Sequence, residues 1–401
     1  METEADLVPS GGVTSPGGFL AGAVSAGIKY SPGKRLDLGI LYSRKPCAAA
    51  AVFTTNKVKA APVLLNRERL QKGRASAVVM NSGYANACTG RQGRANAVEM
   101  TELTARQLKL KPEDVLAAST GVIGEMLPME RIRAAIPKIV LTAEGGHDLA
   151  RAIMTTDTVP KETAFKTGGF TIGGMLKGAG MIHPDMATML CFLTTNAPVE
   201  PDFLKQALKK AVAVSFHMIS VDGDNSTNDM VLIMANGMAG GKAIAGGSRQ
   251  AAAFQRALNK VCIYLAREAV RDGEGATKMI EVKVGGALSS RDARLAARTI
   301  IGSSLVKAAV HGSDPNWGRV LAAAGRSGAA LEEAKTELYI GGTCLVKSGT
   351  PLAYDKKEVV KHLDGKEVYI NLNLNLGKAE ATAWGCDLSE EYVKINAEYT
   401  T

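Results

Sequence analysis

Hydrophobic and polar residues follow two different periodicities along most of this chain. Short apolar runs predict buried strands over residues 48–54, 76–81, 115–118, 230–235 and 279–284. Apolar residues at helical spacing predict helices over residues 62–71, 95–108, 129–140, 202–214 and 249–270. Because strand-like and helix-like segments follow one another, the sequence predicts a mixed α/β fold.

The pattern changes toward the C-terminus. From about residue 336 apolar and polar residues alternate, and residues 368–376 have one apolar face and one asparagine face. Gly377 and Lys378 predict a turn into 379–386, so we expect these two strands to form a hairpin. We place a soft domain boundary near residue 285, between a large core (1–285) and a smaller C-terminal α+β domain (286–401).

Composition excludes several classes of partner. The 401 residues are 46% hydrophobic, enough for a sizeable core, and carry a net charge of +9. The lysines and arginines are scattered, so we expect no nucleic-acid partner, and a moderate positive charge suits acidic small molecules. No apolar run approaches the roughly 18 residues of a membrane-spanning helix, so we expect no membrane partner.

The cysteines and histidines indicate reduced thiols and no metal site. The six cysteines are far apart and form no CxxC pair, and residues 1–6 are acidic, unlike a secretory signal. We therefore expect a cytoplasmic protein. The five histidines are isolated, and the acidic loop 222–229 lacks the glycine and glutamate spacing of a calcium loop, so we predict no metal.

The most specific chemistry lies at the step between Ala187 and Thr188. A Gly/Pro-rich stretch leads into this step, and the apolar run 189–193 that follows predicts a buried strand. A chain break before Thr188 would create an N-terminal threonine whose own amine can take the hydroxyl proton. From this pair alone, an ordinary loop entering a strand is the favoured interpretation.

A wider string changes that interpretation. Residues 177–191, KGAGMIHPDMATMLC, closely resemble the self-cleavage motif of the ornithine acetyltransferase / glutamate N-acetyltransferase (ArgJ-type) family of arginine biosynthesis. Five further segments resemble that family's other motifs in the same order: 119–124, 154–158, 272–278, 312–319 and 392–399. The resemblance extends from near residue 13 to the last residue, so the chain is identified as a member of the family.

The resemblance implies a fold, a processing step and a reaction. The fold is a layered αββα-like sandwich core, shared with DmpA-type N-terminal-nucleophile proteins, with a smaller C-terminal α+β domain. Self-cleavage would give an α chain (1–187) and a β chain (188–401) that stay together, as an α2β2 heterotetramer. The enzyme would transfer acetyl from N2-acetyl-L-ornithine to L-glutamate through an ester on Thr188, without a cofactor. Some members also accept acetyl-CoA, and no residue in this sequence decides that point.

The resemblance also assigns roles to individual residues. Thr188 is the nucleophile, and Thr120 and Gly121 form the oxyanion hole, where each donor contributes about 3–4 kcal/mol. On residue types alone, a plain strand-to-helix turn with Gly121 at positive φ is the favoured interpretation. The implied substrate-binding residues are Thr155, Lys177, Thr188, Glu274, Asn396 and Thr401. The motif leaves open whether the first of these is Thr155 or its neighbour Thr156.

Other interpretations of these residues remain. The segment that begins with Lys177, Gly178 and Gly180 lacks the spacing of a phosphate-binding loop. The remaining alternative to a substrate-binding role for Lys177 is that of a solvated surface lysine. Glu274 between two glycines is also typical of a loop acid, and we expect Cys191 to be packed rather than reactive. For the whole protein, the alternatives are an N-terminal-nucleophile amidohydrolase or aminopeptidase, and an uncut binding protein.

Overall fold

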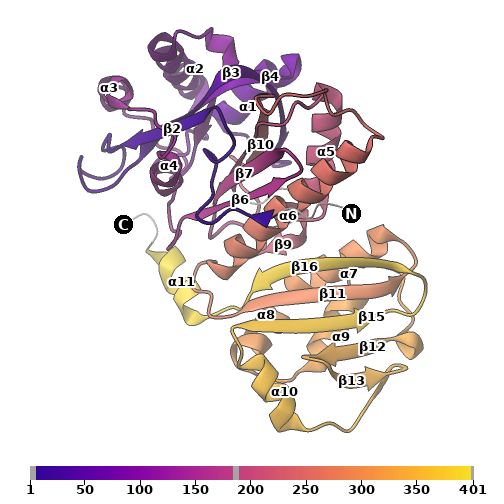
Figure 1. Ribbon diagram of the computed structural model, residues 1–401. Coiled ribbons are helices and arrows are strands. Elements are labelled where there is room, and N and C mark those ends of the chain that lie inside the picture. The colour runs from indigo at the N-terminus through magenta and orange to yellow at the C-terminus, as the bar shows by residue number, and fades with distance from the viewer. Residues whose placement is uncertain (1–5, 184–188, 399–401) are drawn as a thin grey trace. The chain divides into compact units, whose positions relative to one another are not determined.

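The computed structural model describes residues 6–183 and 189–398 (Figure 1). The predicted mixed α/β class is confirmed. Within the described residues the chain forms two compact units whose segments alternate along the sequence. Unit 1 comprises residues 6–178, 189–213 and 225–265, and unit 2 comprises residues 179–183, 214–224 and 266–398. No helix in the described part of the chain has the length and apolarity needed to span a membrane.

This division differs from the single boundary expected near residue 285. Strand β11 (Met279–Ala287) was assigned with the first domain, but its hydrogen-bonded neighbours are β15 (Glu367–Asn373) and β16 (Ala379–Cys386). A strand belongs with the strands it pairs with, so β11 is part of unit 2.

Nine of the described strands form the sheet of unit 1, in the order β1-β6-β7-β8-β10-β3-β4-β5 with β2 also beside β3. Their bounds are β1 Asp6–Leu7, β2 Phe19–Val24, β3 Leu38–Phe53, β4 Arg74–Asn81, β5 Val115–Ser119, β6 Lys161–Thr167, β7 Phe170–Lys177, β8 Leu190–Thr195 and β10 Met230–Ala235. The long strand β3 joins the two halves: residues 38–43 pair with β2, and residues 48–53 pair with β10. Its pairing with β4 shifts register between Tyr42 and Cys47.

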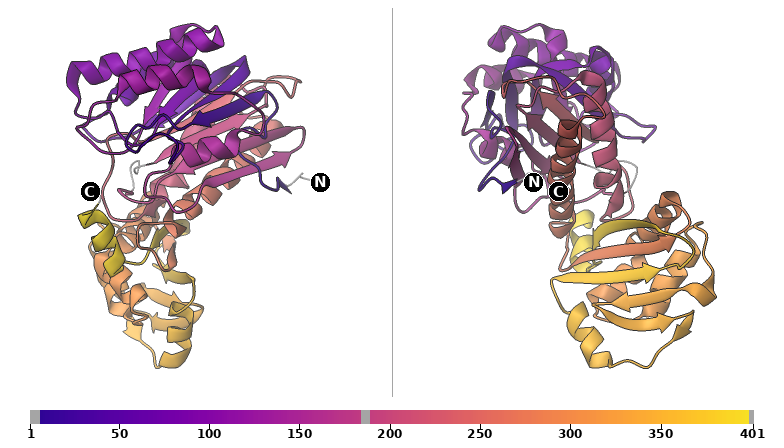
Figure 2. Two further views of the ribbon diagram at one scale, coloured as in Figure 1. Left: turned by 90° about the vertical axis from the view of Figure 1, so that its left-hand side faces the viewer. Right: turned by 45° about the vertical axis from the view of Figure 1, so that its right-hand side comes forward.

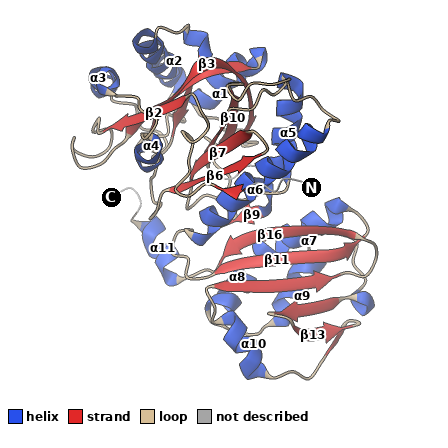
Figure 3. Ribbon diagram, in the orientation of Figure 1, coloured by secondary structure: helices blue, strands red, loops and turns tan. Residues whose placement is uncertain are grey.

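Alternate residues of β4 face two different cores. Val78 and Met80 belong to a buried cluster with residues of β7, β8, β10 and α4, whereas Ala77 and Val79 pack with helices α2 and α3. The period of two along a strand therefore directs the side chains of β4 into two separate cores. The helices of this unit, drawn in blue in Figure 3, are α1 Ala61–Arg69, α2 Gly90–Leu108, α3 Met129–Ala135, α4 Gly146–Ala152, α5 Pro201–Ala213 and α6 Arg249–Arg271. Helix α6 continues past residue 265, where unit 1 ends, and 3-10 turns lie at Leu70–Lys72, Pro112–Asp114 and Ile136–Lys138.

Unit 2 contains a seven-stranded sheet with the order β14-β13-β12-β15-β11-β16-β9. The remaining strands are β9 Ile219–Ser220, β12 Glu337–Ile340, β13 Thr343–Lys347 and β14 Thr350–Pro351. Its helices are α7 Ser290–Ile301, α8 Ser304–His311, α9 Trp317–Gly325, α10 Lys356–Leu363 and α11 Glu390–Ala397, with 3-10 turns at Phe216–Met218 and Glu333–Lys335. Helix α7 packs on β11 and β16, so one face of the sheet is covered by helices (Figure 2).

The predicted hairpin of 368–376 and 379–386 is wrong. Strand β11 lies between β15 and β16, parallel to the first and antiparallel to the second. The connection crosses the end of β11, where the Leu374 N–H donates to Gly285 O and the Gly377 N–H donates to Gly286 O. Gly286 has a φ of +64°, and a Cβ there would lie 2.1 Å from Asn373 Oδ1. The glycine end of β11 thus lets the connection pass closely over it.

Candidate active site

The predicted site residues fall in three places. Ala187, Thr188 and Thr401 lie outside the described residues. Thr120, Gly121, Thr155 and Lys177 belong to unit 1, whereas Glu274 and Asn396 belong to unit 2.

The turn after β5 holds Thr120 and Gly121 in one defined conformation. Thr120 is buried, and its N–H donates to Asn81 O at 3.0 Å. Gly121 has a φ of +127°, and a Cβ at this position would lie 2.2 Å from Gly83 O. Only glycine fits this backbone without displacing its neighbour. A turn fixed in this way suits the preorganised donors that an oxyanion hole requires.

Two adjacent residues connect this turn to the start of β8. Asn228 Nδ2 donates to Ser119 O at 2.7 Å, one residue before Thr120. Asp229 Oδ1 accepts a hydrogen bond from the Met189 N–H at 3.0 Å. Met189 directly follows the predicted cleavage step. One loop therefore holds both the candidate oxyanion turn and the backbone next to that step.

Asp229 has unusual electrostatics for a carboxylate. It is fully buried, and burial raises the pKa of its carboxyl group well above the usual range, more than the Met189 hydrogen bond and the charge of Lys177 lower it. Its second oxygen, Oδ2, has no hydrogen-bond partner among the described residues. Its protonated form is therefore favoured more than that of an exposed carboxyl group, and a protonated carboxyl group can donate one proton and accept another. In the sequence Asp229 is the last residue of the acidic loop 222–229, and no local pattern there indicates a role for it.

The Asp157 carboxylate is hydrogen-bonded at or next to the other predicted site residues of unit 1, Thr155 and Lys177. Its Oδ2 accepts a hydrogen bond from the Thr155 N–H at 3.0 Å. Its Oδ1 accepts hydrogen bonds from the Gly178 N–H and from Lys161 Nζ, both at 2.7 Å. Thr155 and the residue after Lys177 are thus fixed to the same carboxylate. The sequence signal for Asp157 was present, four residues before a lysine and within a family motif, but no role was assigned to it.

Two lysines lie close to the Asp157 carboxylate. Burial opposes ionisation of Asp157, but the charges of Lys177 and Lys161 and the hydrogen bonds together outweigh it and lower the pKa to about 2. Lys177 is only 3% exposed, so it is not a solvated surface lysine. An ammonium group held in this way is the type of group that can bind a substrate carboxylate.

In unit 2 the structure places Glu274 against Asn396. Asn396 Nδ2 donates to Glu274 Oε2 at 2.8 Å, although the two residues are 122 positions apart. The Glu274 N–H donates to Ala179 O at 2.8 Å, and a Cβ on Gly180 would lie 2.3 Å from the Glu274 carboxyl carbon. The glycine of the cleavage motif thus allows this carboxylate to approach the backbone. Two residues predicted to bind substrate are in direct contact.

The surroundings of Glu274 are acidic. Asp222 Oδ1 accepts a hydrogen bond from the Ile182 N–H at 2.8 Å. Burial raises the pKa of Asp222, and the negative charge of Glu274 raises it further. Burial, followed by the charges of Asp222 and Glu274, also raises the pKa of Tyr392. A substrate ammonium group would relieve the repulsion between these acids.

The prediction that Cys191 is packed is confirmed. Cys191 lies fully buried in β8, and burial raises the pKa of its thiol well above the usual range. Among the described residues, no three histidine, cysteine, aspartate or glutamate side chains gather in a way that could hold a metal ion.

Comparison with known proteins decides the family. The model of the ArgJ family matches residues 20–401. The chain belongs to the ArgJ family. It is 53% identical over 405 residues to the arginine biosynthesis bifunctional protein ArgJ of Dehalococcoides mccartyi, with full coverage of both chains. It is 54% identical over 398 residues to the protein of the same name from Symbiobacterium thermophilum, covering 98% of this chain and 99% of that one. The family expected from the six motifs is therefore confirmed.

A solved structure resembles part of this ArgJ-family chain. The crystal structure of the arginine biosynthesis bifunctional protein ArgJ from Bacillus halodurans matches with a TM-score of 0.51 and 41% sequence identity. The match covers 98% of that chain but 52% of this one, so the solved chain has about half the length of this protein. The roles assigned to individual site residues stay predictions.

Proposed function

We propose that this protein is a self-cleaving acetyltransferase of arginine biosynthesis that moves an acetyl group from N2-acetyl-L-ornithine to L-glutamate. Thr188 Oγ attacks the acetyl carbonyl while the Thr188 amine takes the hydroxyl proton, and ornithine leaves with that proton. The amine of glutamate then attacks the acetyl ester, and Thr188 Oγ regains a proton. Two relatives identical over about half of their positions are called arginine biosynthesis bifunctional proteins, which supports this pathway.

The observation that carries the proposal is the loop of Asn228 and Asp229. It fixes the Thr120 turn and the Met189 backbone within one hydrogen-bonded group. In the proposal, the Thr120 and Gly121 donors stabilise the oxyanion that forms when the residue before Met189 attacks. A nucleophile and its oxyanion donors need this kind of fixed relationship.

The charged residues support the choice of substrates. Lys177 lies with Lys161 beside Asp157, and a second acid, Asp222, lies near Glu274. In the proposal, Lys177 binds a substrate carboxylate, and Glu274, held by Asn396, pairs with the side-chain ammonium of the ornithine moiety. Thr155 and Thr401 complete the proposed substrate contacts.

For self-cleavage we assign a role to Asp229. Thr188 Oγ attacks the Ala187 carbonyl, and the bond between the Ala187 carbon and the Thr188 nitrogen breaks. The nitrogen needs a proton and the hydroxyl must lose one, so a neutral Asp229 donates a proton to the nitrogen and accepts the hydroxyl proton on its other oxygen. Water then hydrolyses the resulting ester.

The strand order supports two chains that remain together after cleavage. Strands β8 and β10 follow Thr188 in sequence, yet they lie between β7 and β3, which precede it. Hydrogen bonds therefore join the two proposed products on both sides. The half-length chain of the Bacillus halodurans structure is the length expected of one product.

We propose that two copies of each chain form an α2β2 assembly. We also propose that the assembly is located in the cytoplasm, where the six free cysteines would stay reduced.

We also propose acetyl-CoA as a second acetyl donor, because the relatives carry the word bifunctional in their names. Purified protein given acetyl-CoA and glutamate is expected to form N-acetylglutamate. Absence of that product, with transfer from N-acetylornithine intact, would restrict the donor to N-acetylornithine.

The main activity is tested by incubating purified protein with N-acetylornithine, with and without glutamate, and measuring free ornithine. We expect steady release only when glutamate is present. Thr188→Ala, as the matched control, should release none. Equal release without glutamate would show that water accepts the acetyl group and would make the protein a hydrolase.

A further inference from the structure

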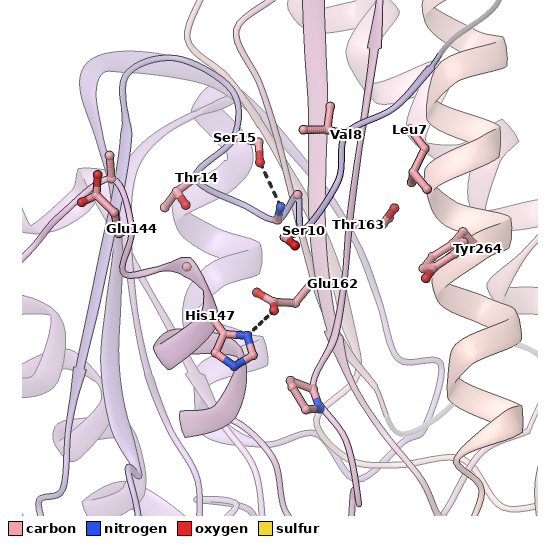
Figure 4. Close-up of a pocket in the computed structure, with 15 residues that line it drawn as sticks. Leu7, Val8, Ser10, Thr14, Ser15, Glu144, His147, Glu162, Thr163 and Tyr264 are labelled. Carbon is pink, nitrogen blue, oxygen red and sulfur yellow. Dashed lines mark hydrogen bonds and ion pairs between the residues drawn. The ribbon is translucent and has the colours of Figure 1, made fainter.

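Unit 1 contains a cavity that the proposed acetyl transfer does not use. Its volume is about 540 Å³, within the range of small-molecule sites. The cavity follows the edge of β6, with Glu162 and His147 on one side and Thr163 and Tyr264 on the other (Figure 4). None of its lining residues is among those predicted for the acetyl-transfer reaction.

The cavity exists because the N-terminal strand leaves the sheet early. Leu7 pairs with Phe165 and the Val8 N–H donates to Ala164 O, but the regular strand pairing ends there, and the chain bends at Ser10, which has a φ of +50°. The edge of β6 before Ala164 is therefore not covered by β1. A short edge strand beside an open sheet edge leaves room for a ligand.

Glycines bring the cavity walls close together. A Cβ on Gly12 would lie 3.0 Å from Glu162 Oε2, and a Cβ on Gly146 would lie 2.7 Å from Thr14 Oγ1. The loop after β1 thus approaches both β6 and the start of α4 without side chains between them. The Glu162 carboxylate keeps its Oε2 facing this narrow space.

The lining is acidic. Glu144 and Glu162 contribute two carboxylates, and none of the described lining residues is a lysine or arginine. Glu162 Oε1 is hydrogen-bonded to His147 Nδ1 at 2.7 Å, which orients the carboxylate and leaves Oε2 for another partner. Two carboxylates beside one imidazole attract a positively charged ligand while that imidazole is neutral.

The other side of the cavity offers an apolar surface. Tyr264 and Leu7 lie there, and a tyrosine ring can contact both a cation and a hydrocarbon stem. Thr163 also lines this side, but its Oγ1 is buried behind the wall, so it is not a ligand contact.

We propose that this cavity binds a small organic cation, an ammonium or guanidinium group on a short apolar stem, with Glu162 as its counter-ion. The described residues contain no cluster that could hold a metal ion, which favours an organic cation. The cavity shares no described residue with the proposed acetyl-transfer site. A negative result for this cavity would therefore leave the proposed function unchanged.

The test uses n-butylguanidinium and its uncharged isostere n-butylurea, followed by saturation-transfer NMR and thermal-shift titration on the full protein. We expect n-butylguanidinium to bind and n-butylurea not to bind. Glu162→Gln should weaken binding at least about tenfold, because a charge-assisted hydrogen bond is lost while His147 keeps an acceptor. Glu144→Gln is a second variant that tests the same acidic wall should the first not fold.

Two matched controls separate this site from general charge and from the active site. Asp148→Asn removes an exposed acid from α4, the helix that carries His147, at a position outside the cavity lining. Glu274→Gln removes the acid proposed to bind ornithine. Neither should change binding of n-butylguanidinium. Equal binding of the two probes, unchanged binding in Glu162→Gln, loss of binding in Glu274→Gln, or no binding at about 10 mM would each overturn the proposal.

Discussion

Replacing Asp157 with asparagine should destabilise unit 1 and disturb the backbone next to Lys177. The Asp157 carboxylate accepts hydrogen bonds from Lys161 Nζ, the Thr155 N–H and the Gly178 N–H. Asparagine keeps the shape but removes the charge, so the ammonium of Lys161, whose side chain is 1% exposed, loses its counter-ion. Removing one partner of a buried ion pair is far more damaging than removing both.

The structure sets the size of this effect. A fall in the pKa of Asp157 from its ordinary value of 3.8 to about 2 corresponds to about 2 kcal/mol of stabilisation of the charged form in the folded protein. In the variant the buried ammonium of Lys161 also loses the carboxylate it pairs with, and this adds to the cost. We therefore expect Asp157→Asn to lower the free energy of unfolding by about 3–4 kcal/mol. Combining it with Lys161→Met should restore part of the loss.

The assay compares all variants in the Thr188→Ala background, where every chain has the same covalent form. Hydrogen exchange of peptides from β6 and β7 reports unit 1. The two tryptophans, Trp317 and Trp384, both lie in unit 2, so their fluorescence during urea unfolding is an internal control that should change little. Asp148→Asn is the matched surface control and should stay within about 0.5 kcal/mol of the parent.

The pH dependence gives a second check with a defined sign. Because the folded-state pKa of Asp157 is lowered, its contribution is fully present above about 3.8 and is lost as the pH falls toward about 2. The difference between parent and Asp157→Asn should therefore shrink across that window. A variant as stable as Asp148→Asn, or a difference that does not change with pH, would refute the reasoning.

Three further predictions concern the proposed site. Thr188→Ala should give one band near 42 kDa on denaturing electrophoresis and no activity, whereas Thr188→Ser should keep some processing; full activity of the alanine variant would contradict the nucleophile. Gly121→Ala should reduce turnover at least about tenfold, because its Cβ would lie 2.2 Å from Gly83 O; unchanged turnover would exclude this turn as the oxyanion hole. Asp229→Asn should slow self-cleavage at least about tenfold in a processing time course. Because the folded-state pKa of Asp229 is raised, the parent protein should lose stability as the pH rises and this carboxyl group ionises. Asp229→Asn should remove that loss. Normal processing and an unchanged pH profile of the variant would contradict the role of Asp229.

Local pattern was sufficient for much of the fold. The apolar run at 76–81 corresponds to β4, and the long helical pattern at 249–270 corresponds to α6. Both signals depend on residues close together in sequence. The helices α7, α8 and α9 were not predicted, because they are short and are interrupted by glycine and serine at 302–303 and 312–313.

Strand partners depended on residues far apart, and there the sequence failed. Nothing in 368–386 indicates that β11, from much earlier in the chain, enters between its two strands. Adjacent strands joined by a turn are usually neighbours, so a hairpin was the natural expectation. The end of β11 at Gly286 provides the close contact that permits the insertion.

The site was predictable only where a motif had a known meaning. The family motifs singled out Glu274 and Asn396, which lie in contact, while their roles in substrate binding stay predictions. Asp157 and Asp229 were missed because their significance comes from partners 21 and 40 positions away, Gly178 and Met189. A sequence shows that an aspartate is present, but burial and partners decide whether it is charged.

The central claim is a covalent one, and intact-mass spectrometry of active protein incubated with N-acetylornithine tests it most directly. The account predicts two polypeptides, the second beginning at Thr188 and carrying one acetyl group that glutamate removes. Active protein found as one polypeptide continuous across residues 187 and 188, or an acetyl group on any other residue, would contradict it.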